Sequence, residues 1–385
     1  MELAGELAGQ STEWEPVSLR IGAQGLLTGM KSMSWTPSSL ISTLIHAAPR
    51  SSYSASSFPG ELLWIPQSLD YSECSPGDCL PALLLRCNHA RYLMLYLHSN
   101  AEDIGTARHF AMGVRMLLGM HVLVPEYPGY GCAPGQYSET TLWQATASAF
   151  RWVTEVVKWP TEDIIVMGRS LGASLAIRMA CSHAFHGLIL VAPFLSLKEA
   201  IGDHVGMLAP AVQETMYKNS DRITKVNVPT LVIHALNDKL VNCRHGQKLY
   251  ELCPHEKKLL VCPSTLGHNG DLLRDANYLI HPMLRLFSLP DYSLADLMVP
   301  PQAFDKSLCF KYHAIFEGAR DAKIIQRNDG DSGPDIESSV GDIDLKDGPR
   351  AVKQGCPASS GDNEVLETDD GVALLVHDGR FSCDV

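Results

Sequence analysis

The stretch Gly168-Arg-Ser-Leu-Gly172 decides the fold because of what lies on either side of it. The preceding run at 163–167 (Asp-Ile-Ile-Val-Met) is apolar and β-branched, as in a buried strand, and the run at 173–180 (Ala-Ser-Leu-Ala-Ile-Arg-Met-Ala) is typical of a helix. A serine on so sharp a strand-to-helix turn needs small neighbours, which the two glycines supply. The context predicts a nucleophile elbow at Ser170. A tight turn whose serine caps the helix is the alternative.

Strand-like and helix-like runs alternate on both sides of this turn. Near-continuous apolar strands that alternate with helices indicate a parallel sheet that is buried on both faces. We therefore predict an α/β fold with a mostly parallel, twisted sheet of about eight strands, helices on both faces and no large cap domain. The expected strands lie at 61–65, 80–86, 92–97, 121–125, 163–167, 187–192, 230–234 and 258–262, and the expected helices at 107–118, 141–159 (with Ser138 as N-cap) and 173–180.

Composition divides the chain into three parts. Residues 1–57 are rich in Ser, Gly, Ala and Pro, which predicts a poorly ordered arm. Residues 58–290 hold the alternating pattern and form the predicted catalytic domain. Residues 291–385 are expected to be a largely disordered tail, acidic and rich in Gly, Ser and Asp, because such a composition buries too little apolar surface to offset the entropy of ordering.

Charge and cysteine usage exclude several classes of protein. The net charge of −12 argues against a nucleic-acid partner, which selects a basic surface. None of the eleven cysteines forms a C-x-x-C pair, so neither a metal site nor a redox motif is expected, and no organic cofactor is indicated. Their odd number and the lack of an apolar leader or of a membrane-length apolar run indicate a cytoplasmic protein with no integral membrane segment.

Two further residues complete a catalytic constellation with Ser170. A serine hydroxyl needs a base to accept its proton and an acid to orient that base. Asp238 follows the expected strand at 230–234, and His268 follows the one at 258–262, so both fall at the sheet edge that carries the serine. The order Ser, acid, His is that of α/β-hydrolases. Alone, Asp238 would be interpreted as a turn former and His268 as an exposed loop histidine.

The transition state also needs hydrogen-bond donors aimed at the developing oxyanion. We expect one from the backbone N–H of Leu171 and the other from the backbone N–H of Asn100, with Ala101 as second choice. His98, at the start of the same loop, is expected to order the loop without taking part in catalysis.

Five neighbouring side chains are given roles outside the triad. Tyr127 and Tyr130 either line a pocket for the acyl or leaving group or pack in the core. Arg169 either contacts an anionic substrate or, as we favour, a neighbouring carboxylate. Glu102 and Asp103 are expected to cap the following helix at its positive end. The spaced pair His183 and His186 lacks a third metal ligand.

From about residue 58 to 288 the chain resembles the α/β-hydrolase-domain proteins of family 17, the protein depalmitoylases. The resemblance lies in the segments at 91–105, 126–131, 168–172, 190–194 and 229–234, in Asp238 and in Gly267-His-Asn269. It implies an α/β-hydrolase fold, nucleophile, acid and base roles for Ser170, Asp238 and His268, hydrolysis of acyl esters or thioesters, and no metal or cofactor.

Two departures from the family pattern bear on function. Ser99 replaces the usual glycine of the oxyanion loop, and no cysteine precedes Cys74, whereas the family carries an acylated N-terminal cysteine cluster. The sequence thus favours a serine hydrolase of acylated proteins or lipid-like esters. A transient peripheral contact with membranes stays open. The alternatives are a serine peptidase of the same fold and a non-catalytic binding protein.

Overall fold

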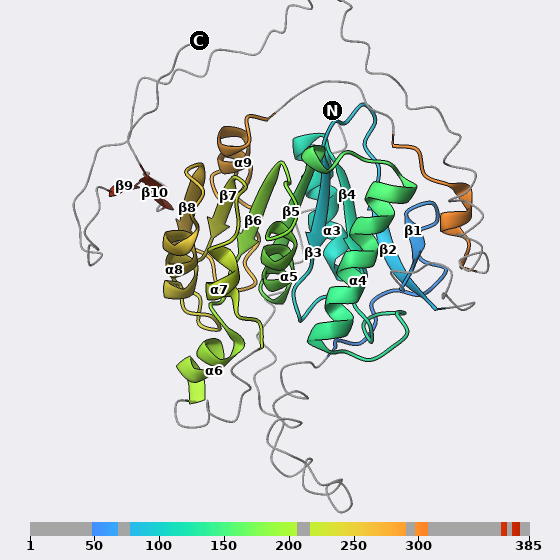
Figure 1. The fold of residues 1–385 in the computed structure, drawn as a ribbon, viewed down its shortest axis with the longest axis horizontal. Coiled ribbons are helices and arrows are strands. Elements are labelled where there is room, and N and C mark those ends of the chain that lie inside the picture. Colours follow the sequence, from blue (N-terminus) through green and yellow to red (C-terminus); the bar gives the residue numbers. More distant parts are fainter. Residues whose placement is uncertain are drawn as a thin grey trace, which may run out of the picture.

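A computed structural model describes residues 48–67, 78–205, 216–289 and 297–306, together with the strands at 363–367 and 372–377. One twisted sheet crosses the molecule, and helices cover it on both sides (Figure 1). Its ten strands have the order β1-β2-β4-β3-β5-β6-β7-β8-β10-β9. The run β4-β3-β5-β6-β7-β8 is parallel, and β1, β2, β10 and β9 pair antiparallel with their neighbours.

All eight strands expected from the apolar runs are present, with small shifts at their ends. They are β1 (Leu62–Pro66), β2 (Cys79–Leu85), β3 (Leu93–Leu97), β4 (His121–Pro125), β5 (Ile164–Arg169), β6 (Gly187–Val191), β7 (Thr230–Ile233) and β8 (Lys258–Pro263). The added strands are β9 (Asn363–Glu367) and β10 (Val372–His377).

The helices divide between the two faces of the sheet. They are α3 (Ile104–Leu118), α4 (Glu139–Arg151), α5 (Leu171–Ala180), α6 (Leu197–Val205), α7 (Asn219–Ile223), α8 (Arg244–Leu252) and α9 (Ile280–Leu286), with a π-helix at Trp152–Val156 and short 3-10 turns at Thr161–Asp163 and Pro301–Phe304. Two apolar clusters form the core. One holds side chains of α4, α5, α7 and α8, and the other those of α3 and α9. Along β3 and β5 successive residues alternate between the clusters, which is why these strands are apolar throughout.

The helix starts follow from local hydrogen bonding. Asp103 caps α3 by accepting the Thr106 N–H at 2.9 Å, and Ser138 caps α4 by accepting the Thr141 N–H at 3.0 Å, both as expected. The prediction for Glu102 is wrong. Its carboxylate accepts the backbone N–H of Ser99 instead, at 3.0 Å, because the residue lies inside the turn before the helix.

The predicted N-terminal arm is ordered in its last part. The Ser52 N–H donates to Asp103 Oδ2 at 2.6 Å, and the buried Tyr53 hydroxyl donates to Glu126 Oε2 at 3.0 Å. The last residues of the predicted arm therefore pack against the catalytic domain, because a single aromatic residue in a Ser-rich segment supplies both apolar area and a hydroxyl for the core. Residues 1–47 lie outside the described part.

The acidic tail contains a β-hairpin where no regular structure is expected. Strand β10 pairs antiparallel with β8, from Val372 opposite Pro263 to Val376 opposite Leu259, and β9 pairs with β10. The average composition of the tail conceals the apolar run Val372-Ala-Leu-Leu-Val376, which can complete the edge of a sheet. The other residues beyond 306 lie outside the described part.

The remaining expectations concern membrane-spanning helices, the cysteines and a cap domain. In the described ranges no helix is both long and apolar enough to cross a bilayer. Six of the cysteines there are free thiols and Cys79 is disulfide-bonded, a bond that cysteine usage did not predict. Between β6 and β7 the structure describes α6 and α7, and the residues at 206–215 that link them lie outside the described part, so the absence of a large cap stays a prediction.

Candidate active site

The turn at Ser170 has the backbone of a nucleophile elbow. Ser170 joins β5 to α5 with φ 52° and ψ −112°, a conformation that costs a non-glycine residue about 1–3 kcal/mol. Its backbone N–H donates to Val191 O at 2.8 Å, which anchors the turn to the next strand. Its side chain makes no capping hydrogen bond to α5, so the helix-cap alternative is wrong. The hydroxyl is therefore available to a partner outside the helix.

The two glycines of the elbow are required by close approach. A Cβ on Gly168 would lie 2.3 Å from Gly172 O, and one on Gly172 would lie 2.0 Å from Leu97 O and 2.7 Å from His98 O. These contacts are with backbone atoms, which cannot move aside cheaply. The elbow therefore packs directly on the end of β3, where the loop carrying the expected oxyanion donor begins.

The three residues expected to form a triad are brought together. The Ser170 hydroxyl lies 3.0 Å from His268 Nε2, and His268 Nδ1 lies 2.7 Å from Asp238 Oδ2. With Nδ1 protonated, His268 donates to the carboxylate and presents Nε2 as an acceptor for the serine proton. The sheet explains this proximity, because Ser170, Asp238 and His268 follow the parallel strands β5, β7 and β8 at their carboxyl ends.

The Asp238 carboxylate is fixed from several sides. Oδ1 accepts the backbone N–H groups of Leu240 and Val241 at 2.8 and 2.9 Å, and the ring of His234 lies 3.4 Å from Oδ2. Burial opposes ionisation, but hydrogen bonds from His234 and His268 outweigh it and hold the pKa of Asp238 well below its ordinary range. The group is therefore a carboxylate near neutral pH and can stabilise an imidazolium at His268.

The expected oxyanion donors flank the same edge of the sheet. Leu171 is the first residue of α5, and the N–H groups of a helix's first turn have no partner within the helix. Asn100 lies on the loop after β3, where Tyr130 donates to its side-chain Oδ1 at 2.6 Å and the Glu102 N–H closes the turn on Ser99 O at 3.3 Å. The oxyanion roles of Leu171 and Asn100 stay predictions, as does the role of Ala101 as second choice to Asn100.

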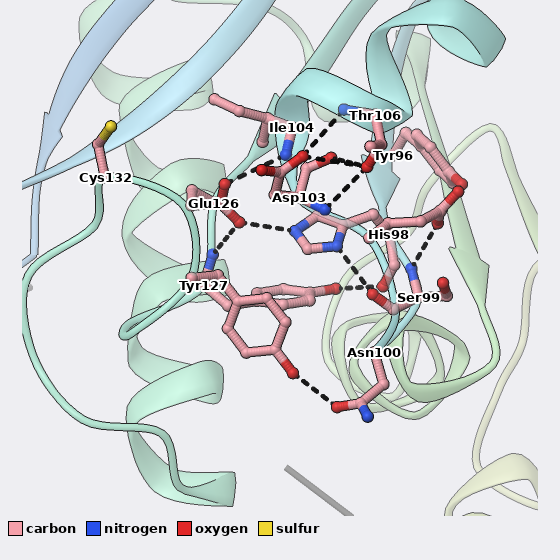
Figure 2. Close-up of polar contacts among 12 residues, drawn as sticks. Tyr96, His98, Ser99, Asn100, Asp103, Ile104, Thr106, Glu126, Tyr127 and Cys132 are labelled. Carbon is pink, nitrogen blue, oxygen red and sulfur yellow. Dashed lines mark hydrogen bonds and ion pairs between the residues drawn. The ribbon is translucent and has the colours of Figure 1, made fainter. Parts of the chain in front are cut away.

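A buried ion pair lies beneath this loop (Figure 2). His98 and Glu126 are both fully buried, and His98 Nε2 lies 3.0 Å from Glu126 Oε1. His98 Nδ1 lies 2.9 Å from the carbonyl of Ser99. A backbone carbonyl and a carboxylate are both acceptors, so these two contacts favour the doubly protonated, charged ring. Burial lowers the pKa of His98, but the Glu126 carboxylate overrides this effect and raises it.

Glu126 collects four hydrogen bonds and so determines how the loop is held. Oε1 accepts from His98 and from the Tyr127 N–H, and Oε2 accepts from the Ile104 N–H (Figure 2). Oε2 also accepts from the Tyr53 hydroxyl. The expectation that His98 orders the loop agrees with these contacts. Sequence reasoning assigned no role to the Glu126 carboxylate or to the Tyr53 hydroxyl. The available signals were the position of Glu126 directly after β4 and its place in the segment 126–131, which carries part of the family resemblance.

The two tyrosines beside this pair pack in the core. Tyr127 and Tyr130 are fully buried, the Tyr127 ring lies 4.1 Å from that of His98, and the Tyr127 hydroxyl donates to His98 O at 2.8 Å. Of the two alternatives, packing rather than the lining of a pocket therefore applies. Burial raises the pKa of Tyr127 and of Tyr130, so both hydroxyls remain donors.

The His98–Glu126 pair predicts a pH-dependent contribution to stability. Because the pKa of His98 is raised in the folded state, its contribution is complete below the unfolded value of about 6.5 and declines as the pH rises through the folded value. We expect the difference in unfolding free energy between wild type and His98→Asn to shrink as the pH rises above about 6.5. Denaturant titrations at several pH values measure it, and a constant or growing difference would contradict a charged His98.

None of the described residues form a group of three or more His, Cys, Asp or Glu able to hold a metal ion. The two histidines that are spaced like metal ligands each contact a backbone carbonyl. His183 Nδ1 lies 3.1 Å from Met179 O, and His186 Nε2 lies 3.0 Å from Phe287 O.

The strand order, the antiparallel β2 and the elbow between β5 and α5 define an α/β-hydrolase fold. Within that fold the chain resembles the α/β-hydrolase domain-containing proteins 17. No family model matches it.

Relatives include protein 17C of Xenopus tropicalis (30% identical over 208 residues, 53% of this chain and 64% of the relative) and human protein 17B (27% over 200 residues, 51% and 67%). Protein aho-3 of Caenorhabditis elegans, also named for its α/β-hydrolase domain, is 28% identical over 262 residues, 63% of this chain and 76% of the relative. The chain thus spans 64% of the length of the Xenopus protein.

Solved structures with a similar fold include the Pyrococcus furiosus esterase Pf2001 (16% identity, 59% of this chain and 86% of that one, TM-score 0.43). An α/β-hydrolase from Vibrio vulnificus is 21% identical over 60% of this chain and 81% of its own, with a TM-score of 0.45.

Proposed function

We propose that the protein is a serine hydrolase that cleaves acyl ester or thioester bonds. The observation that carries the proposal is the continuous chain from the Ser170 hydroxyl to His268 at 3.0 Å and from His268 to Asp238 at 2.7 Å. These distances lie within the range in which a base can accept the proton of a nucleophile.

The reaction would proceed in two acyl transfers. Ser170 Oγ attacks the acyl carbonyl carbon while His268 Nε2 takes the hydroxyl proton, and Asp238 stabilises the imidazolium. The carbonyl oxygen becomes an oxyanion held by the N–H groups of Leu171 and Asn100. Collapse breaks the bond to the alcohol or thiol, which receives the proton from His268. Water then attacks the acyl-Ser170 ester by the same route, and the acid product leaves.

The helix that follows the serine adds to this electrostatic stabilisation. The N-terminus of α5 begins at Leu171, so its positive end faces the place where negative charge develops. The position of Ser99 is compatible with an ordered loop, since its N–H is held by Glu102 at 3.0 Å. This contact supports an intact oxyanion site despite the missing glycine.

The resemblance to the depalmitoylase family favours acylated proteins, including palmitoyl thioesters, among the candidate substrates. The described connection between β6 and β7 contains only α6 and α7, which supports an open active-site edge that suits a bulky substrate. A cytoplasmic location with transient membrane contact, expected from the sequence, remains part of this proposal.

A fluorophosphonate probe tests the proposal directly. We expect the purified wild type to be labelled and Ser170→Ala to lose labelling by at least about 1,000-fold, because the probe traps only an activated serine. Ser182→Ala is a matched control at an exposed site just beyond α5 and should label like wild type. Gel fluorescence against time gives the rates. An unlabelled wild type, or equal labelling of Ser170→Ala, would favour the non-catalytic alternative.

The substrate class requires a second comparison, made on fresh protein that the probe has not modified. Short-chain and long-chain acyl thioesters, acyl esters and aminoacyl amides should be offered at equal concentration. The proposal expects kcat/KM for a thioester or ester to exceed that for the amide. Cleavage of amides alone would select the serine peptidase instead, because both enzymes would use the same elbow and triad.

A further inference from the structure

Arg169, the residue before the nucleophile, turns its side chain into the protein. It is only 7% exposed, although arginine is seldom buried without partners. The space beside it, lined also by Ala192, Leu266 and His268, measures about 10 Å³, enough for a single water molecule. An anionic substrate therefore has no room to reach the guanidinium, and the alternative of substrate binding by Arg169 is wrong.

The guanidinium holds the turn that carries His268. Arg169 Nη2 donates to two backbone carbonyls of this turn, at 3.2 Å to His268 O and at 3.0 Å to Gly270 O. The turn is also held by Asn237, which donates to Ser264 O, by the contact of Thr265 with Tyr278 at 2.6 Å, and by the Gly270 N–H, which donates to Gly267 O at 3.0 Å. Asp238 binds the imidazole of His268, whereas Arg169 binds the backbone carbonyl of the same residue.

The charge of the same guanidinium also acts on a carboxylate of the loop that carries the expected oxyanion donor. Although burial works against ionisation, the charge of Arg169 and the N–H of Ser99 together lower the pKa of Glu102 below its ordinary value. Glu102 Oε2 in turn accepts that N–H at 3.0 Å and the Tyr96 hydroxyl at 3.4 Å. The positive charge of Arg169 is thus compensated by a carboxylate that fixes the backbone next to Asn100.

We propose that Arg169 is a positioning residue that clamps the base-bearing turn to the nucleophile elbow. Its two hydrogen bonds join the segment that follows β5 to the turn that follows β8. Because Arg169 is the chain neighbour of Ser170, any movement of the elbow is carried to the turn of His268. The 3.0 Å separation of Ser170 Oγ from His268 Nε2 is then a consequence of this clamp.

The inference rests on the proposed function for its catalytic meaning, but the clamp itself can be measured without activity. Hydrogen–deuterium exchange of the full chain reports how often the backbone of residues 264–272 opens. In Arg169→Gln we expect exchange in this segment to be about 10-fold faster, because two hydrogen bonds to its carbonyls are lost. Segments distant from the clamp, such as α4, should exchange as in wild type.

Fluorophosphonate labelling then links the clamp to reactivity. We expect Arg169→Gln to label about 10- to 100-fold more slowly, since a displacement of about 1 Å in a catalytic group has an effect of this size. Arg169→Lys should recover only part of the rate, because one ammonium cannot reproduce the planar guanidinium that binds both carbonyls. Glu102→Gln should slow labelling as well. In the double variant Arg169→Gln with Glu102→Gln, the labelling rate should fall by less than the product of the two single effects.

Arg108→Gln is the matched control. Its guanidinium also binds a carboxylate, Glu61, at 2.8 and 3.2 Å, but on the outer side of α3. It should change neither exchange at 264–272 nor labelling. Unchanged exchange of this segment in Arg169→Gln would overturn the proposal whatever the labelling does, and so would a uniform increase over all segments. Faster exchange at 264–272 in a protein that the probe never labels would support the clamp and refute the proposed hydrolase.

Discussion

His268→Ala should lower kcat for acyl transfer by about 10⁶-fold, since the serine is then left without a base. The 3.0 Å contact with Ser170 and the 2.7 Å contact with Asp238 place His268 as the single link between nucleophile and acid. Asp238→Asn keeps the shape of the site but removes the charge, so a smaller loss of about 10⁴-fold is expected. Both rates are measured on the best thioester or ester substrate under single-turnover conditions.

The residues of a triad act as a unit, which gives this prediction its sharpest control. In the double variant Ser170→Ala with His268→Ala, the loss should be no greater than in either single variant. His281→Ala, at an exposed position on α9, should retain the wild-type rate. If the two losses multiplied, Ser170 and His268 would be acting independently and the proposed mechanism would fail.

Gly172→Ala should destabilise the fold by about 3 kcal/mol or more, because the added methyl would lie 2.0 Å from Leu97 O and 2.7 Å from His98 O. Neither atom belongs to a side chain that can rotate away, so α5 and β3 would have to separate. For a domain of this size the melting temperature should fall by roughly 10 °C. Differential scanning calorimetry or thermal unfolding followed by circular dichroism measures the change.

A second glycine provides the comparison for Gly172. A Cβ on Gly267 would meet no atom within 4 Å, so Gly267→Ala should leave the melting temperature almost unchanged. An equal effect of the two substitutions would show that general loss of glycine flexibility, rather than the contact between the elbow and β3, governs stability.

The fold and the position of the triad could be predicted because they depend on local signals. Each buried parallel strand is an uninterrupted apolar run, and the elbow carries its own glycines. Since parallel strands end at one edge of the sheet, the position of Asp238 and His268 after such strands was enough to bring them near Ser170.

The supporting contacts could not be predicted, because they join segments that are distant in the sequence. Tyr53 donates a hydrogen bond to Glu126, and Arg169 donates one to the turn of His268. No periodic pattern in the sequence predicts either contact. The function assigned to Glu102 failed for a related reason. A carboxylate near the start of a helix has several backbone N–H groups close to it. The geometry of the turn determines that Glu102 accepts the N–H of Ser99.

The pairing of β10 with β8 has a consequence for how the protein is made. A ribosome releases Ser170, Asp238 and His268 well before it releases β10, so the active-site half of the sheet can form while the outer edge of β8 is still unpaired. During that interval the free backbone groups of β8 are a template for a strand of any other nascent chain. The pairing of β10 with β8 therefore ends a period of vulnerability to aggregation that lasts as long as translation of the tail.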